Sequence, residues 1–151
     1  MGLDQFAGVK QTKRYEWKTP EGEIKVDEYQ MAGPFEWRKH ARLQEFMNTL
    51  YMERNDIENK WEEIARNDGT DETYWNPISW DEIKLKHQDI DRLEKAIRSR
   101  YSEYFFEGGF MWGHEIQEEQ RDYYREQDLE FVEFAREKLA NNETVVYSCS
   151  W

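Results

Sequence analysis

The chain has 151 residues and a formal net charge of −12, from 33 acidic and 21 basic residues. This length predicts one domain, residues 1–151, that buries about two-thirds of the surface of its unfolded chain. An excess of acidic groups repels phosphate, so we expect no direct nucleic-acid binding and no attraction to anionic membranes. The aromatic content of 16% argues against disorder, because disordered chains are poor in aromatic residues.

Cysteine content and the absence of targeting signals indicate a cytoplasmic protein. Cys149 is the only cysteine, so no internal disulfide can form, and a reducing compartment is expected. No run of about 18 apolar residues predicts a membrane span. The opening Met1-Gly2-Leu3-Asp4 lacks the basic and apolar regions of a signal peptide. Gly2 is a weak myristoylation signal, since Phe6 stands where Ser or Thr is favoured.

The N-terminal part of the chain predicts short strands. Residues 2–9 and 14–17 are candidate strands, and Thr19-Pro20-Glu21-Gly22 is typical of a turn. Residues 23–29 alternate apolar and charged side chains, which predicts the second strand of a β-hairpin. Residues 31–36, which include Gly33-Pro34, are predicted to form a loop.

The rest of the chain predicts four helices and two further strands. Apolar residues at three-and-four spacing form one stripe in each helical segment. The predicted helices cover residues 37–53, 56–66, 88–101 and 117–140, and the predicted strands cover 78–86 and 144–151. Helices and strands are interspersed without regular βαβ alternation. The pattern therefore predicts an α+β domain, with about four helices packed on a small, mostly antiparallel sheet.

Common catalytic and cofactor motifs are absent from the sequence. It contains no phosphate-binding glycine-rich loop, no GxGxxG, no Gly-x-Ser-x-Gly and no HExxH. One cysteine excludes a cysteine-based zinc site. His114 and Glu115 could contribute to a metal site with distant carboxylates, but chance proximity explains them better in so acidic a chain. The aromatic residues in 104–112 are expected in the core rather than stacked on a ligand, and we predict no cofactor and no metal.

His40 and Asp128 are the candidate site residues. His40 lies three residues before Leu43, at the edge of an apolar stripe, and Asp128 lies within the stripe of the last helix. A buried carboxylate needs a partner, so we expect these side chains to meet, with Arg38 or Asp4 nearby. The pair is either a structural ion pair or a site of proton transfer. His87 is expected at a helix N-terminus, and Cys149 is expected to be packed and inert.

Three stretches resemble a group of small phage-encoded proteins, including proteins of cyanophages. They are the opening Met-Gly-Leu-Asp, the segment Glu36-Trp37-Arg38-Lys39-His40, and the Ser- and Trp-rich end with Val146-Tyr147-Ser148-Cys149-Ser150-Trp151. Phe6 and Cys149 depart from the pattern, which has Tyr and Ser there. The resemblance covers about a third of the chain and implies no established activity. It implies a protein made in the cytoplasm of an infected bacterium.

This origin favours a non-enzymatic module that binds and modulates a host macromolecule. The expected partner is a host protein with a basic surface, and one form of this function is the mimicry of a polyanion. The alternative is a small enzyme or small-ligand-binding protein that uses His40, Asp128, Arg38 and Asp4. A virion component is the third option, and the sequence leaves the oligomeric state open.

Overall fold

The computed structural model describes residues 3–57, 77–78, 81–103 and 122–150. The described residues form one antiparallel sheet of four strands and three helices, which confirms the predicted α+β class. In chain order the elements are β1 (Asp4–Lys18), β2 (Ile24–Arg38), α1 (Ala41–Asn55), β3 (Glu82–Leu85), α3 (His87–Arg98), α5 (Arg125–Ala140) and β4 (Val145–Ser150).

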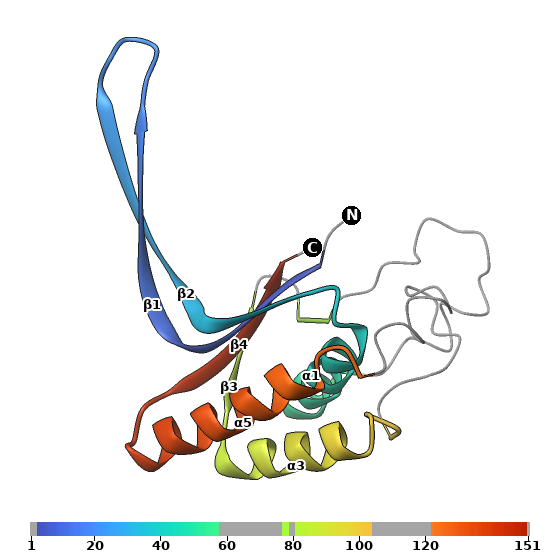
Figure 1. Cartoon of the computed structure of the whole chain (residues 1–151). Helices are drawn as coiled ribbons and strands as arrows, with labels where there is room; N and C mark the ends of the chain where they lie inside the picture. The colour runs from blue at the N-terminus through green and yellow to red at the C-terminus, as the bar shows by residue number, and fades with distance from the viewer. Residues whose placement is uncertain (1–2, 58–76, 79–80, 104–121, 151) are drawn as a thin grey trace, which may run out of the picture.

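The strands are ordered β2-β1-β4-β3, and the helices cover one face of the sheet (Figure 1). Strand register explains this one-sided cover. Ala7 of β1 lies opposite Phe35 of β2 and Tyr147 of β4, and directly opposed residues share a face. Phe35 contacts Phe131 of α5 at 5.2 Å between ring centroids, and Tyr147 bonds to Gln44 of α1. The apolar side of the sheet is therefore buried under α1 and α5.

The β1–β2 hairpin is much longer than the sequence predicted. The turn at Thr19-Pro20-Glu21-Gly22 is confirmed, and the Gly22 N–H donates to the Thr19 carbonyl at 2.9 Å. The loop predicted for residues 31–36 is wrong, because these residues continue β2. β2 is an edge strand, and an edge strand tolerates Pro34, which has no N–H to donate. Gly8 allows the strands to pass closely there, since a Cβ on Gly8 would lie 2.0 Å from the Gly33 oxygen.

The predicted helix boundaries need three corrections. Helix 37–53 was placed too early, because Trp37 and Arg38 belong to β2 and α1 begins at Ala41. α1 ends where Asp56 turns into the left-handed conformation, and the rest of the predicted helix 56–66 lies outside the described residues. Helix 88–101 is α3, which begins at His87 as expected and ends at Arg98. The described part of the chain thus holds three helices rather than four.

The end of the final helix and the final strand agree with their predicted positions, but α5 begins at Arg125 and residues 122–124 of the predicted helix form a turn. α5 ends at Ala140, and Asn142 takes a left-handed φ of 60°, as a helix C-terminus favours. The part of the predicted helix 117–140 that precedes residue 122 lies outside the described residues. Among the helices that the structure describes, none is long and apolar enough to cross a membrane.

The distal part of the hairpin projects from the body of the molecule (Figure 1). We call residues 12–30 the arm. Every described side chain in the arm is exposed except Thr19, which is half-buried. β4 pairs with β1 only at residues 4–8, so β1 and β2 pair only with each other throughout the arm. The arm is therefore a two-stranded ribbon with both faces in solvent.

Candidate functional site

His40 is fixed at the start of α1 by backbone and side-chain hydrogen bonds. It is the N-cap residue of α1, and its Nδ1 accepts a hydrogen bond from the Leu43 N–H at 3.5 Å. Gln5 of β1 holds the His40 backbone twice: its Oε1 accepts from the His40 N–H at 2.8 Å, and its Nε2 donates to the His40 carbonyl at 3.0 Å. The imidazole is thus positioned by the sheet as well as by the helix.

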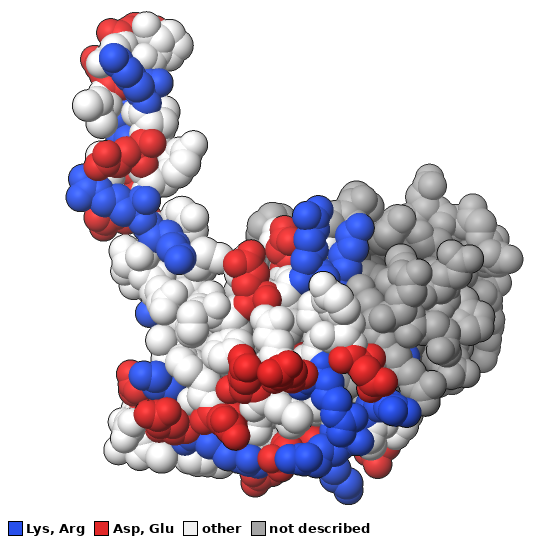
Figure 2. Space-filling model, in the orientation of Figure 1, with Lys and Arg blue, Asp and Glu red and all other residues white. Residues whose placement is uncertain are grey.

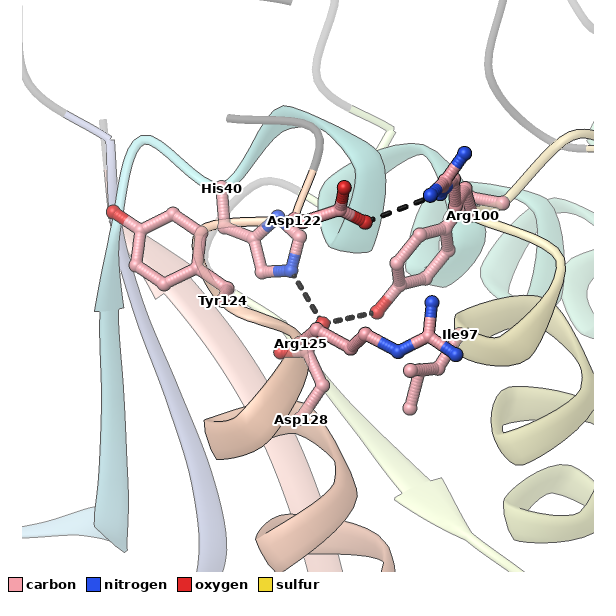
Figure 3. Close-up of a pocket in the computed structure, with 8 residues that line it drawn as sticks. His40, Ile97, Arg100, Asp122, Tyr124, Arg125 and Asp128 are labelled. Atoms are coloured by element: carbon pink, nitrogen blue, oxygen red, sulfur yellow. Dashed lines mark hydrogen bonds and ion pairs between the residues drawn. The ribbon is translucent and has the colours of Figure 1, made fainter. Parts of the chain in front are cut away.

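Asp128 joins the ends of all three described helices. Its Oδ2 accepts from His40 Nε2 at 2.8 Å and from the Tyr101 hydroxyl at 2.7 Å (Figure 3). His40 caps the start of α1, Tyr101 follows the end of α3, and Asp128 lies in the first turn of α5. A carboxylate in that position is also favoured by the dipole of α5. The expected meeting of His40 and Asp128 is therefore present in the structure.

The cluster is enclosed by aromatic rings. His40 and Asp128 are each only 2% exposed. The Tyr124 ring stacks on His40 at 4.5 Å between centroids with an interplanar angle of 25°, and Tyr101 meets His40 edge-on at 5.6 Å. The Tyr124 hydroxyl donates to the Arg38 carbonyl, which holds this ring over the imidazole. Water therefore has little access to the His40–Asp128 pair.

Both imidazole nitrogens of His40 are engaged. Nδ1 accepts a backbone N–H, so in the neutral ring the proton lies on Nε2, which donates to Asp128. A general base needs a nitrogen within hydrogen-bond reach of a substrate proton. In this geometry His40 offers none, and the contacts fit a structural joint between the helices.

Asp128 Oδ1 is the one unusual feature of the cluster. This atom is buried and has no hydrogen-bond partner among the described residues. It adjoins a small pocket with a volume of about 10 Å³, which is roughly the space of one water molecule. The pocket is lined by His40, Ile97, Arg100, Tyr101, Asp122, Tyr124, Arg125 and Asp128 (Figure 3). A space of this size has room for about one water molecule and none for a substrate.

Arg38 and Asp4 are not part of this pocket. They lie opposite each other on neighbouring strands, and Arg38 is exposed while Asp4 is half-buried. Among the described residues, neither Arg38 nor Asp4 has a side-chain contact with Asp128. The Arg38 carbonyl accepts from the hydroxyl of Tyr124, whose ring stacks on His40, so Arg38 lies near the cluster through its backbone. Tyr101 takes the place that was expected for a basic partner.

A buried polar chain next to the cluster was missed by the sequence analysis. Gln5 Nε2 donates to the Tyr147 hydroxyl at 3.0 Å, and that hydroxyl donates to Gln44 Oε1. Gln44 Nε2 in turn donates to Asn48 Oδ1 at 3.1 Å. Gln44 and Asn48 lie four residues apart on α1, a spacing that places them on one helical face. The four-residue spacing of Gln44 and Asn48 is visible in the sequence, but an apolar stripe by itself does not predict that polar side chains share its face.

The remaining candidates offer no chemistry in the described residues. Cys149 is 7% exposed and accepts a hydrogen bond from Gln44 Nε2 at 3.5 Å, which agrees with a packed thiol. His114, Glu115 and residues 104–112 lie outside the described residues. Within the described ranges, no group of three or more His, Cys, Asp or Glu side chains is placed to hold a metal ion.

Two buried tyrosines make the protein sensitive to alkali. Burial raises the pKa of Tyr101 well above its usual value, and the charge of Asp128 raises it further. Burial likewise raises the pKa of Tyr147. In the unfolded chain both hydroxyls ionise at about pH 10. Above that pH the unfolded state loses protons that the folded state keeps, so the free energy of unfolding should fall as pH rises.

Urea unfolding between about pH 8 and about pH 11 measures this effect. The fall of the free energy of unfolding with pH should be less steep in Tyr101→Phe, because one of the two buried hydroxyls is gone. A stability that stays constant to about pH 11 in the wild-type protein would contradict the assignment.

Comparison with known protein families, with curated proteins and with solved structures found no match. Function is therefore inferred from the geometry of the His40–Asp128 cluster and of the arm.

Proposed function

We propose that this protein is a non-enzymatic binding module whose arm engages a partner protein. The observation that carries the proposal is the set of large apolar side chains on the arm that face solvent. Ile24 is 73% exposed, Tyr15 60%, Tyr29 51%, Val26 45% and Trp17 39%. Exposed aromatic groups gathered in one place are typical of protein interfaces.

Strand alternation sorts these side chains onto two faces. Tyr15 and Trp17 are two residues apart, and Tyr29 lies opposite Lys13, so all three aromatic residues share one face. We call this the aromatic face. The rings of Tyr15 and Trp17 stack at 5.6 Å between centroids. Ile24 and Val26 lie on the opposite face.

The charge distribution supports a partner with a basic surface. The arm carries four basic and five acidic residues, so nearly all of the net charge of −12 belongs to the rest of the chain. Figure 2 shows basic and acidic side chains interleaved along the arm. A basic partner protein would complement the acidic charge of the chain, and an apolar recess on it would accept the exposed aromatic side chains of the arm. Such binding would be made in the host cytoplasm if the chain is phage-encoded.

The enzymatic alternative has weaker support. His40 and Asp128 are buried, both imidazole nitrogens are engaged, and the adjoining pocket has room for about one water molecule. Arg38 and Asp4, the other candidates, do not line that pocket.

Removing the aromatic face should weaken partner binding. We expect the triple variant Tyr15→Ser/Trp17→Ser/Tyr29→Ser to retain folding and to lose at least about tenfold in affinity, since truncating buried aromatic anchors often costs about 2 kcal/mol or more each. The measurement is quantitative affinity capture from host lysate followed by titration of the purified partner. Tyr123→Ser is the matched control, because Tyr123 is 76% exposed and lies outside the arm.

Two outcomes decide against the proposal. One is capture of the same partner, at the same affinity, by the triple variant. The other is equal loss of binding in Tyr123→Ser, which would show that the arm has no special part. Weaker binding at higher salt would support the contribution of the acidic body, because salt screens exposed charges.

A further inference from the structure

We infer that the arm pairs with the arm of a second copy of this chain, along the free edge of β2. Two antiparallel β2 strands related by a two-fold axis at Val26 would join the two ribbons into a four-stranded sheet over residues 24–28 of each copy. This inference does not depend on the proposed partner protein, because it concerns the edge of the ribbon and not its aromatic face.

The free edge is the first observation. β2 ends the strand order β2-β1-β4-β3, so alternate residues along its outer side present backbone N–H and C=O groups without a neighbouring strand. An isolated two-stranded hairpin is marginally stable in water, whereas three or more strands with an apolar face are stable. The arm extends beyond β4, and a second ribbon is the simplest source of the missing strands.

Charge complementarity favours one register at the tip of the arm. With the axis at Val26, Lys25 of one copy lies opposite Asp27 of the other, and the two-fold symmetry forms this pair twice. Opposite charges placed directly across an antiparallel pair are stabilising. Within the described residues Lys25 and Asp27 form no ion pair in the single chain, so both are available.

Neighbouring registers are worse. A two-fold axis at Lys25 places two lysines directly opposite each other, an axis at Asp27 opposes two aspartates, and an axis at Glu28 opposes two glutamates. Like charges directly opposite one another are destabilising. Moving the axis by one residue in either direction places it on a charged residue, so the Val26 register is preferred over these two neighbours.

The side chains on both faces of the resulting sheet are compatible with this register. In each chain Trp17 lies opposite Lys25, and Tyr15 lies opposite Asp27. A row across the four strands would then read Trp17, Lys25, then Asp27 and Tyr15 of the second copy. On the other face the two Val26 side chains would meet at the axis, flanked by Ile24, which is 73% exposed in the single chain. In this register Ile24 lies opposite Glu28 of the second copy and diagonal to its Val26, so the pairing covers Ile24 only in part.

The β1 edge of the arm is the competing surface. Arg14 and Glu16 would also be complementary around an axis at Tyr15, but they already form an ion pair at 3.0 Å within one chain. β1 also lies inside the sheet at residues 4–8, where β4 occupies its edge. No strand among the described residues pairs with the outer edge of β2 in the arm; nearer the body, the side chains of Gln127 and Tyr124 bond to the carbonyls of Glu36 and Arg38. Pairing through β2 alone is isologous and closes at the dimer.

Charge exchange tests the pairing directly. Sedimentation equilibrium over a concentration series should show a dimer for the wild-type protein. Lys25→Asp and Asp27→Lys should each weaken dimerisation by about tenfold or more, because each replaces two attractive pairs by two repulsive ones. The double variant Lys25→Asp/Asp27→Lys should restore the dimer. Lys13→Asp is the matched control: it makes the same charge change on the same face but on β1, and it should leave the dimer intact.

Cysteine crosslinking locates the axis. Cβ atoms of opposed residues lie about 4.5–5.5 Å apart, close to the separation that a disulfide spans. Val26→Cys should therefore crosslink two copies under mild oxidation, and the buried Cys149 should give no background. Tyr15→Cys should not crosslink, although Tyr15 is more exposed than Val26, because it lies on β1.

A wild-type protein that remains monomeric to about millimolar concentration would overturn the inference. Failure of the double variant to restore the dimer would overturn the register, and crosslinking of Tyr15→Cys in place of Val26→Cys would assign the interface to β1. These measurements use the purified chain alone, so a negative result would not affect the proposed partner binding. Likewise, loss of partner binding in the aromatic-face variant would not affect the proposed dimer.

Discussion

Replacing Asp128 with alanine should lower the free energy of unfolding by about 3–5 kcal/mol, the range for removing one member of a buried ion pair. Asp128 Oδ2 is the common acceptor for His40 Nε2 and the Tyr101 hydroxyl. Its removal leaves two buried donors without their acceptor at the point where three helices meet. Urea unfolding followed by circular dichroism measures the loss.

Asp122→Ala is the matched control for this change. Asp122 lines the same pocket, but its side chain is 52% exposed and pairs with Arg100 at 3.1 Å. An exposed pair contributes about 0–1 kcal/mol, so this variant should be nearly as stable as the wild type. A loss below about 1 kcal/mol for Asp128→Ala would show that the cluster is not a structural joint.

A milder substitution at the same position, Asp128→Asn, separates the two interpretations of the cluster. If His40 and Asp128 form a joint, the less damaging Asp128→Asn should keep partner binding unchanged while the protein remains folded. If they form a reactive site, Asp128→Asn should abolish a host-directed activity without a matching loss of stability. Measuring both stability and partner binding decides between the two interpretations. A structural joint predicts that binding is kept, whereas a reactive site predicts that activity is lost without a matching loss of stability.

Sequence periodicity was sufficient to place His40 and Asp128 together. Both residues lie on or beside an apolar stripe, and helices that share one core bring such stripes into contact. The role of Tyr101 could not be obtained in this way. It follows the end of α3, where Arg100 and Tyr101 both take positive φ angles. That local reversal directs the chain beyond α3, and no periodic pattern of side chains encodes it.

The arm was predicted only in part, for a different physical reason. The alternation in residues 23–29 predicted a strand, and the turn residues predicted a hairpin. The length of the hairpin depends on a register that runs without interruption from Lys18 opposite Ile24 to Asp4 opposite Arg38. Pro34 and Gly33 are typical of loops, and only their place on an edge strand makes them compatible with pairing. Edge position is a property of the whole sheet and is not visible locally.

The position of Asp128 depends on how firmly α5 is held against the sheet. Phe131 lies three residues after Asp128 and is fully buried. Its ring contacts Phe35 at 5.2 Å and Trp37 at 5.6 Å between centroids, both edge-on. These contacts join α5 to β2, the same strand that leads into His40. Phe131 therefore fixes the carboxylate and the imidazole relative to each other.

Phe131→Ala should accordingly lower the free energy of unfolding by about 3–5 kcal/mol, from lost burial and the cavity left beside Trp37. Phe134→Ala provides the comparison on the same helix. Phe134 also contacts Phe35 at 5.2 Å, but it is half-buried, so its loss should cost about half as much or less. The two changes should not add, because both rings pack on Phe35. Equal losses for the two variants would contradict the packing described, since burial and not ring contact alone sets the larger value.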